Sequence, residues 1–433
     1  MVLEGTFSID QFHENTRDKS IYQGHYYSDK APGLAFMGVI PFRVSRQFMI
    51  LGGQQDHSFV QRVWTEHLTT LFTVGLLSAL LGVFIFRFCR KLTGDTRHSL
   101  FLAAAYGVAT PVLAYASLFF SHQATAALLF FSFICIFHAG EYQRSGGLLL
   151  TFSGFFAGSA AVSEYPAGLA VLCIMIYLIL VHRSFRSILY FVIGLLPPLL
   201  LCGYYHAVCF DSPFVTAYSY KFFYDKVHGQ GFSGITLPSL RAMAYLLFSL
   251  RKGLFVFSPF FLLSIPGYYF WYRAGIYRRE WFFFLLFPIF YLVILSGFTD
   301  INAGWSLGPR HLIAAWPFLA VPAVFTFTRF RTLSVIVVSI SLLIGLAAVS
   351  VKPEIPALYP FPHRDFILPN FPAGNLSINS PRFNKFLPLA RIPANDFYAF
   401  NLGEAAGLKG LWSLIPLIAG WGTGVFLFFR ISR

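Results

Sequence analysis

An acid and a base stand side by side in the stretch GHYYSDKAPG, at Asp29 and Lys30, just before a long hydrophobic run. A neighbouring ammonium group favours the ionised form of a carboxylate. An ionised acid beside a cation suits transfer of a group from a phosphate, because the acid can accept a proton while the cation neutralises the departing phosphate. Three interpretations of Asp29 remain open: a loop acid without function, a ligand of a metal ion or sugar hydroxyl, and a general base.

Three further cations lie near the ends of hydrophobic runs: Arg251 and Lys252 in RKGLF, and Arg310 in GPRHL. Guanidinium and ammonium groups form charge-assisted hydrogen bonds with phosphate oxygens. Together with Lys30, these residues are therefore candidates for binding a lipid-linked phosphate or diphosphate. The alternative for each is a long side chain that reaches interfacial water from the membrane boundary.

Candidates for contacts with a substrate are polar or aromatic residues in the same kind of position: His122, Glu164, Tyr165, Trp305 and His311. Each has a structural alternative that the sequence leaves open. Glu164 in SEYPAG is suited to capping the helix that follows, since acids favour helix N-termini. His122 is equally a boundary residue, and Trp305 is either an interfacial aromatic or a wall for a sugar ring or prenyl chain.

The elements that must position these residues are transmembrane helices. The chain of 433 residues is 56% hydrophobic and 12% charged, contains 53 Phe and has a mean hydropathy of +0.64, which indicates an integral membrane protein. The predicted fold class is an all-α polytopic membrane protein with about eleven transmembrane helices. The predicted runs are 68–86, 99–120, 123–139, 147–163, 165–182, 188–206, 253–272, 281–298, 311–328, 333–350 and 411–429.

The distribution of Lys and Arg predicts the orientation. If Met1 lies outside, the short inner loops and the C-terminus hold 14 of the 32 basic residues, and the short outer turns hold only Arg310. This asymmetry matches the preference of Lys and Arg for cytoplasmic loops. The net charge of +14 is therefore mainly a topology signal, and we expect no nucleic-acid partner.

The predicted organisation has four parts. Residues 1–66 form an outer segment with an amphipathic helix, and 67–350 form a transmembrane core with an outer loop at 207–252. Residues 351–410 form a small outer segment, and 411–433 form the last transmembrane helix and a cytoplasmic tail. In this topology all the candidate residues above lie on the outer, non-cytoplasmic side.

Five segments together resemble the GT-C membrane glycosyltransferases of bacteria and archaea, relatives of the protein O-mannosyltransferases and of the aminoarabinose transferases that modify lipid A. The segments are GHYYSDKAPG at 24–33, SEYPAG at 163–168, FDSPFVTAY at 210–218, KGLFVFSP at 252–259 and GWSLGPRHLIAAWPFL at 304–319. The resemblance runs from about residue 4 to 328. Each motif is weak alone, but their order makes the set fairly specific.

The resemblance implies a GT-C-like transferase of the cell (inner or plasma) membrane. Such an enzyme takes a sugar from a polyprenyl-phosphate donor to a lipid, glycan or protein acceptor on the periplasmic or extracellular face, usually with inversion. In that family an acid-Lys-Pro-Pro segment supplies an acid near the active centre and a lysine for the donor phosphate, which correspond to Asp29 and Lys30. Ala31 replaces the first proline. By the same analogy Arg251, Lys252 and Arg310 are further phosphate contacts.

One departure concerns the region before LEGTFSID. Family members carry a first transmembrane helix and an acid that is the usual candidate for the catalytic base upstream of this segment, and only Met1 and Val2 precede it in this sequence. The expectation is therefore a member without its first helix and its usual base. A catalytically degenerate homologue is one alternative function.

A transporter or flippase of lipid-linked sugars is the other alternative. It would need a polar path across the membrane, but no predicted run has an acid or base at its centre, where transport chemistry is usually found. The sequence also leaves the cofactor open. A divalent cation such as Mg²⁺ or Mn²⁺ would be held by oxygen ligands, with Asp29 as the candidate.

Overall fold

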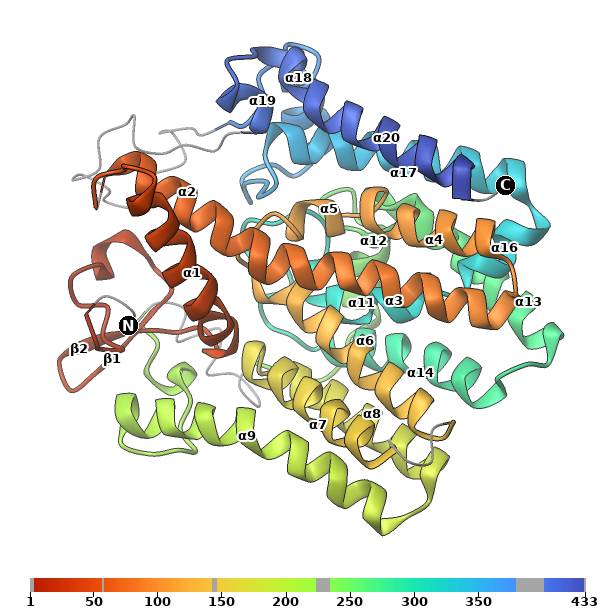
Figure 1. Cartoon of the computed structure of the whole chain (residues 1–433), viewed down its shortest axis with the longest axis horizontal. Coiled ribbons are helices and arrows are strands. Elements are labelled where there is room, and N and C mark those ends of the chain that lie inside the picture. The colour runs from red at the N-terminus through yellow and green to blue at the C-terminus, as the bar shows by residue number, and fades with distance from the viewer. Residues whose placement is uncertain (1–3, 57, 142–145, 223–233, 379–400, 432–433) are drawn as a thin grey trace.

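The computed structural model describes residues 4–56, 58–141, 146–222, 234–378 and 401–431, and most of these residues are helical (Figure 1). Among the described residues, seven helices are long and apolar enough to cross a membrane, or eight if one bent pair counts as a single span. The prediction of a helical, polytopic membrane protein is therefore confirmed. The predicted number of eleven spans is not.

Six of the eleven predicted runs correspond to these helices. They are part of Val60–Thr93, then α6 (Ser121–Ala139), α7 (Gly146–Ser163), α9 (Phe185–Phe210), α17 (Arg331–Val351) and Gly410–Leu427, which includes most of α20 (Ile415–Ile431). Val60–Thr93 combines α2 (Phe59–Thr70), the π-helical segment η2 (Leu71–Gly75) and α3 (Leu76–Thr93).

The other predicted runs are shorter, broken or charged. The run 99–120 divides into α4 (Thr96–Val108) and α5 (Val112–Tyr115), because Pro111 cannot continue a helical hydrogen-bond pattern. The run 253–272 breaks at Pro259 into α12 (Leu254–Phe257), the 3₁₀ turn η4 (Pro259–Leu263) and α13 (Ser264–Ala274).

Three more runs differ in other ways. The helix α8 (Ala167–His182) has only 16 residues. The helix α14 (Arg278–Leu295) is long enough, but three of its 18 residues are charged. The run 311–328 is bent by 49° between Arg310–Ala320, which comprises η5 (Arg310–Ala315) and α15 (Trp316–Ala320), and α16 (Ala323–Arg329).

One candidate span lies outside the predicted runs. The helix α1 (Gly33–Leu51) has 19 residues, contains Arg43 and Arg46, and lies in the segment 1–66 for which the sequence predicts an amphipathic helix. Its exposed apolar side chains follow one stripe, with Ile40, Val44 and Phe48 at spacings of four. Such a stripe suits contact with lipid or with the membrane interface.

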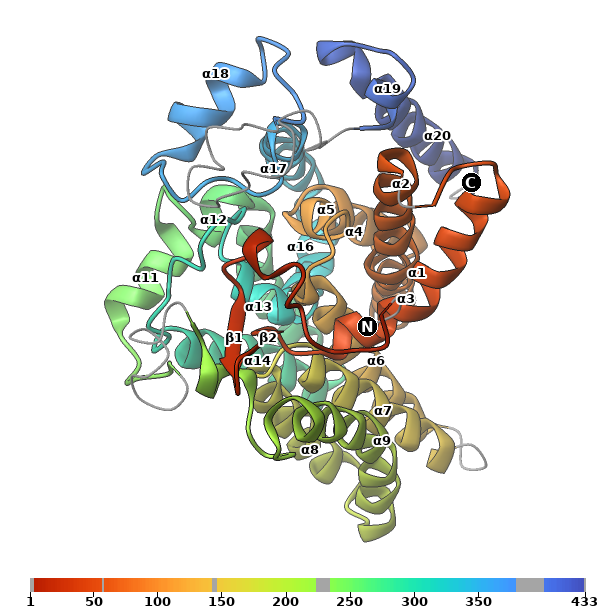
Figure 2. The ribbon, with the colours of Figure 1, turned by 90° about the vertical axis from the view of Figure 1, so that its left-hand side faces the viewer.

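The N-terminal segment forms an antiparallel hairpin at one end of the helical bundle. Strand β1 (Lys19–Tyr22) pairs with β2 (His25–Ser28), and Gln23 and Gly24 at the turn both have positive φ, as a tight hairpin turn requires. Figure 2 shows the hairpin near the centre of this end of the molecule. The C-terminus of α20 lies at the opposite end in Figure 1.

The core helices pack through small residues. A Cβ atom on Gly154 of α7 would lie 1.8 Å from the carbonyl oxygen of Phe191, and one on Gly194 of α9 would lie 1.8 Å from that of Thr151. These two glycines let the backbones of α7 and α9 approach closely, as in many membrane helix pairs. The helix α6 is buried along most of its length.

The remaining elements are short connections or caps around this bundle. They are η1 (His13–Asn15), η3 (Ala217–Tyr220), α11 (Leu240–Phe248), η6 (His363–Ile367), α18 (Leu368–Asn370), α19 (Leu402–Ala405) and η9 (Gly410–Leu414).

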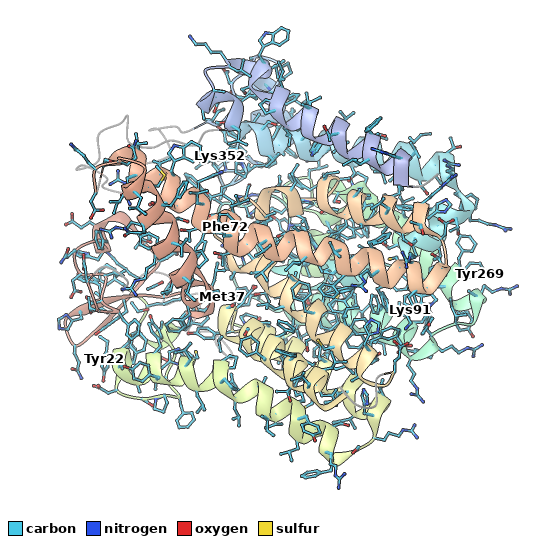
Figure 3. All side chains as sticks on the ribbon, viewed as in Figure 1. Tyr22, Met37, Phe72, Lys91, Tyr269 and Lys352 are labelled. Carbon is cyan, nitrogen blue, oxygen red and sulfur yellow. The ribbon has the colours of Figure 1, made fainter. Side chains whose placement is uncertain are left out.

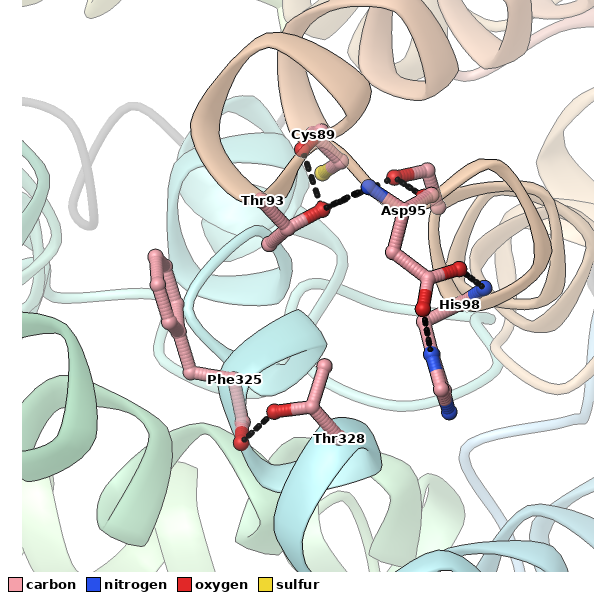
Figure 4. A network of polar contacts seen from close by, with 7 residues as sticks. Cys89, Thr93, Asp95, His98, Phe325 and Thr328 are labelled. Atoms are coloured by element: carbon pink, nitrogen blue, oxygen red, sulfur yellow. Dashed lines mark hydrogen bonds and ion pairs between the residues drawn. The ribbon is translucent and has the colours of Figure 1, made fainter.

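The turn between α3 and α4 carries a local polar network (Figure 4). The carboxylate of Asp95 accepts hydrogen bonds from the backbone N–H of His98 at 3.0 Å and pairs with its ring Nδ1 at 2.6 Å. Asp95 is therefore the N-cap of α4. In Figure 3, Lys91 near this turn lies at the far end of the molecule from Tyr22 in the hairpin.

Candidate functional site

Asp29 lies between strand β2 and helix α1 and is almost completely buried. Its Oδ1 is 3.1 Å from Nζ of Lys30, and its Oδ2 is 3.3 Å from Nζ of Lys221. Among the described residues no hydrogen bond reaches Oδ1, so its contact with Lys30 is an ion pair without good hydrogen-bond geometry. The result is one buried carboxylate held between two ammonium groups.

Lys30 keeps its ammonium group accessible. Its side chain is 54% exposed, and Nζ also lies 3.0 Å from Oδ1 of Asp18. Partial burial alone would lower the pKa of Lys30, but the charges of Asp29 and Asp18 outweigh this and raise it. Lys30 is therefore a charged group that an incoming anion can reach.

The residue that sequence reasoning missed is Lys221. Its side chain is only 4% exposed, and its ammonium lies over the ring of Tyr218 at 4.1 Å from the centroid. Burial lowers the pKa of Lys221, and Asp29 partly offsets this effect. Its position follows from strand pairing, because Lys221 bridges to Ser20 of β1, whose hydroxyl donates to the carbonyl of Ala217 at 2.6 Å.

Gly33 sets the position of the Asp29–Lys30 turn relative to α7. A Cβ atom on Gly33 would lie 2.6 Å from the carbonyl carbon of Val162 and 2.7 Å from the backbone nitrogen of Ser163. Only glycine allows the start of α1 to approach the end of α7 this closely. This contact brings the turn to the end of α7, directly before Glu164 in the sequence.

Replacing Gly33 by alanine is therefore expected to lower the free energy of unfolding by about 1–3 kcal/mol, the usual cost of overpacking. The matched control is Gly82→Ala in α3, where no atom lies within 4 Å of the added Cβ. That change should be neutral or slightly stabilising, because alanine favours helix over glycine. Unfolding in detergent micelles measures both variants, and equal effects would contradict the packing role of Gly33.

A second polar cluster joins three segments that are distant in sequence. Glu164 Oε1 lies 3.0 Å from Nδ1 of His122 at the start of α6 and 3.7 Å from Nδ1 of His311 in η5. Burial would raise the pKa of Glu164, but the two histidines lower it to about 2. Among the described residues the Glu164 side chain pairs with these histidines and makes no hydrogen bond to the first turn of α8, whose N-cap is Pro166.

Tyr165 and Tyr218 connect the two clusters. The rings of Tyr165 and Tyr218 pack edge to face with centroids 5.3 Å apart, and the Tyr165 hydroxyl lies 2.8 Å from Nε2 of His206. Burial raises the pKa of Tyr218, and so do the negative charges of Asp29 and Glu164. Lys221, which pairs with Asp29, lies over the Tyr218 ring, and Tyr165 directly follows Glu164, so these contacts place the two clusters in one region.

The side chains of Arg251 and Lys252 both donate hydrogen bonds to groups of the protein. The Lys252 ammonium is buried and donates to the carbonyl oxygens of Asn302 and Gly304 and to the Ser306 hydroxyl, the last at 2.7 Å. Burial, followed by the charge of Arg310, lowers the pKa of Lys252 to about 7. Lys252 therefore holds the 302–306 loop through three hydrogen bonds, and its phosphate contact stays a prediction.

The remaining cations are placed differently. Arg251 donates to the carbonyl of Ala357, whereas Arg310 donates from Nη1 to the carbonyl of Trp305 at 3.2 Å. The buried Nε of each arginine has no hydrogen-bond partner among the described residues. The guanidinium of Arg310 also lies 5.7 Å from the ring centroid of Phe120, and Arg310 directly precedes His311 of the second cluster.

Trp305 is half-buried in a tight loop. The preceding residues Ala303 and Gly304 both have positive φ, and the ammonium of Lys352 lies 5.9 Å from the Trp305 ring centroid. The structure therefore places Trp305 beside the site through its carbonyl, which accepts from Arg310, and leaves its role as a substrate wall untested.

No known protein-family profile and no curated protein matches this chain. Two solved structures are similar to it, both of ArnT from Cupriavidus metallidurans, one in the apo state and one bound to undecaprenyl phosphate. Their TM-scores are 0.46 and 0.44, each at 16% sequence identity. The similarity covers 90% of this chain and 67% and 68% of those chains. Likenesses at these values assign no function to this chain.

Proposed function

We propose that this protein is a membrane glycosyltransferase. It moves one sugar from a polyprenyl-phosphate donor to a hydroxyl group of a lipid, glycan or protein on the non-cytoplasmic face, with inversion at the anomeric carbon. The observation that carries the proposal is the buried Asp29 carboxylate between Lys30 and Lys221, with Lys30 still open to an anion. The motif set that contains SDKAPG supports the same reaction class.

The cations account for binding and departure of the donor phosphate. Cleavage of the bond between sugar and phosphate leaves additional negative charge on the phosphate oxygens. The ammonium of Lys30 can reach that phosphate, and Arg310 brings a second positive charge to the same region. Fixed cations that face developing negative charge stabilise a transition state more than the ground state.

The carboxylate accounts for activation of the acceptor. The Asp29 carboxylate lies between two ammonium groups, and a carboxylate can accept a proton as a general base. Its Oδ1 accepts no hydrogen bond within the described part of the chain, and an acceptor hydroxyl reaches this buried oxygen when the exposed Lys30 side chain moves aside. Attack of the hydroxyl oxygen on the anomeric carbon, opposite the departing phosphate, forms one glycosidic bond, breaks one sugar–phosphate bond and inverts the carbon.

The helical scaffold suits a lipid carrier. Helices α1 and α9 expose apolar side chains along their length, including Phe48 and Leu200, so a prenyl chain can remain in the lipid phase. A carrier phosphate at the membrane surface would then meet the end of the bundle where the hairpin and α1 lie (Figure 2).

The experiment is a transfer assay on the full chain reconstituted in lipid vesicles with a radiolabelled polyprenyl-phosphate sugar. Formation of a new glycoside together with free polyprenyl phosphate is expected. Movement of the labelled lipid between leaflets without any glycosidic bond would contradict the proposal and favour a flippase. Donor binding without turnover would favour a degenerate homologue.

A further inference from the structure

The cluster of His122, Glu164 and His311 has the shape of a metal site. One ligand atom from each residue can be chosen so that all three lie within 4.8 Å of one another. The two measured separations from Glu164 Oε1 are 3.0 Å to His122 Nδ1 and 3.7 Å to His311 Nδ1. Ligand atoms around a tetrahedral zinc ion lie about 3.3 Å apart, given metal–ligand distances of about 2.0–2.1 Å.

A second observation also points to a ligand. Glu164 is more than nine-tenths buried, and its Oε2 has no hydrogen-bond partner among the described residues. A buried carboxylate oxygen that remains unpaired is costly, and a bound cation is one way to satisfy it. An aromatic ring packs against each of the two imidazoles, Tyr115 against His122 and Phe298 against His311.

The ligand types select the class of metal. Two imidazole nitrogens and one carboxylate suit Zn²⁺ and other late first-row ions, whereas Mg²⁺ prefers oxygen ligands. Asp29, the metal ligand considered from the sequence, is a poorer candidate. The ammonium groups of Lys30 and Lys221 lie beside its two oxygens, and their positive charges disfavour a cation there.

We propose that His122, Glu164 and His311 bind one Zn²⁺ ion. Three protein ligands leave the fourth tetrahedral position for water or a substrate oxygen, as in zinc sites that act on substrates. Tyr165, which directly follows Glu164, packs against Tyr218, and the ammonium of Lys221 lies over the Tyr218 ring, so the three ligands lie near the Asp29–Lys30 pair. The proposal stands on the three ligands and does not require the glycosyltransferase activity.

The test is zinc binding by the full chain purified in detergent. After treatment with a chelator, the protein is titrated with ZnCl₂ in a calorimeter, and its melting temperature is measured with and without zinc. We expect one Zn²⁺ per chain and a higher melting temperature in its presence. Loss of a residue that only hydrogen-bonds to a metal ligand typically lowers metal affinity by about 10–100-fold. Glu164→Gln removes a ligand itself, so it should lower zinc affinity by more than this.

The matched control is His98→Gln. His98 also pairs with a carboxylate, Asp95, at 2.6 Å, but it belongs to no three-residue group of this kind among the described residues. This change should leave zinc affinity unchanged. Equal losses in Glu164→Gln and His98→Gln would overturn the proposal.

A second variant guards against misfolding. If Glu164→Gln does not fold, His311→Gln takes its place, because the His311 side chain is 23% exposed and its loss disturbs packing less. In that variant zinc should no longer raise the melting temperature. Wild-type protein that shows neither stoichiometric zinc binding nor a zinc-dependent melting temperature would overturn the proposal outright.

Discussion

Lys30→Ala is expected to lower the turnover number for sugar transfer by about 10²–10³-fold, the usual effect of removing one group that stabilises transition-state charge. The protein should still insert and fold, because the Lys30 side chain is 54% exposed and the buried Asp29 carboxylate keeps Lys221 as a partner. Lys30→Arg keeps the positive charge and should recover part of the activity. Transfer rates with the reconstituted enzyme, together with melting temperatures in detergent, measure these effects.

Lys91→Ala is the matched control for Lys30→Ala. Lys91 also forms an ion pair with an acid, Glu141, but it lies at the opposite end of the molecule from the hairpin (Figure 3). Its removal should leave transfer unchanged. Full activity of Lys30→Ala would remove Lys30 from the phosphate site, and equal losses in both variants would indicate a general effect of lost ion pairs.

Asp29→Asn is expected to have the largest effect on stability. It leaves the ammonium of Lys221, whose side chain is 4% exposed, without its negative partner. Breaking a buried ion pair by removing one member typically costs about 3–5 kcal/mol, because the remaining charge stays desolvated. Chemical unfolding in mixed micelles measures this loss, and transfer activity should also disappear because asparagine cannot accept the proton.

The double variant Asp29→Asn/Lys221→Met separates the two effects. Methionine removes the buried charge while keeping an apolar side chain of similar length, so most of the lost stability should return. Lys30 keeps Asp18 as a partner at 3.0 Å, so it needs no further compensation. Transfer should remain absent, because the carboxylate is still missing.

An exposed pair provides the reference for the Asp29 effect. Asp365→Asn breaks the contact with Arg364, whose side chain is 73% exposed, and should cost less than about 1 kcal/mol. If Asp29→Asn costs no more than Asp365→Asn, then Lys221 is solvated in the working protein. That result would contradict the description of the site as a buried carboxylate between two ammonium groups.

The sequence allows prediction of the membrane class and of most long helices. Uninterrupted apolar runs such as 123–139 and 333–350 correspond to α6 and α17, because hydrocarbon thickness sets a minimum length that composition can reveal. The exact number of spans is harder to predict. Breaks at Pro111 and Pro259 depend on where neighbouring helices can satisfy the freed backbone groups.

The candidate site also has a part that the sequence predicts and a part that only the fold reveals. The adjacency of Asp29 and Lys30 is local, so the pair could be identified from the sequence itself. His122, Glu164 and His311 lie 42 or more positions apart in the sequence. Only the packing of α6, the end of α7 and η5 brings one ligand atom of each within 4.8 Å of the others. The sequence named all three as candidates but did not indicate that they form one cluster.

Lys221 shows most clearly what only the tertiary structure decided. Nothing in the segment AYSYK distinguishes its lysine from a surface cation. Its burial against Asp29 arises because Lys221, in the chain after α9, forms a β-bridge with Ser20 of the hairpin, 201 positions earlier. The sequence by itself determined a helical membrane protein with an acid and a lysine before α1. Long-range strand pairing and close helix packing at Gly33 decided which charges meet that acid, because burial and Coulomb interactions depend on distance in space and not on distance along the chain.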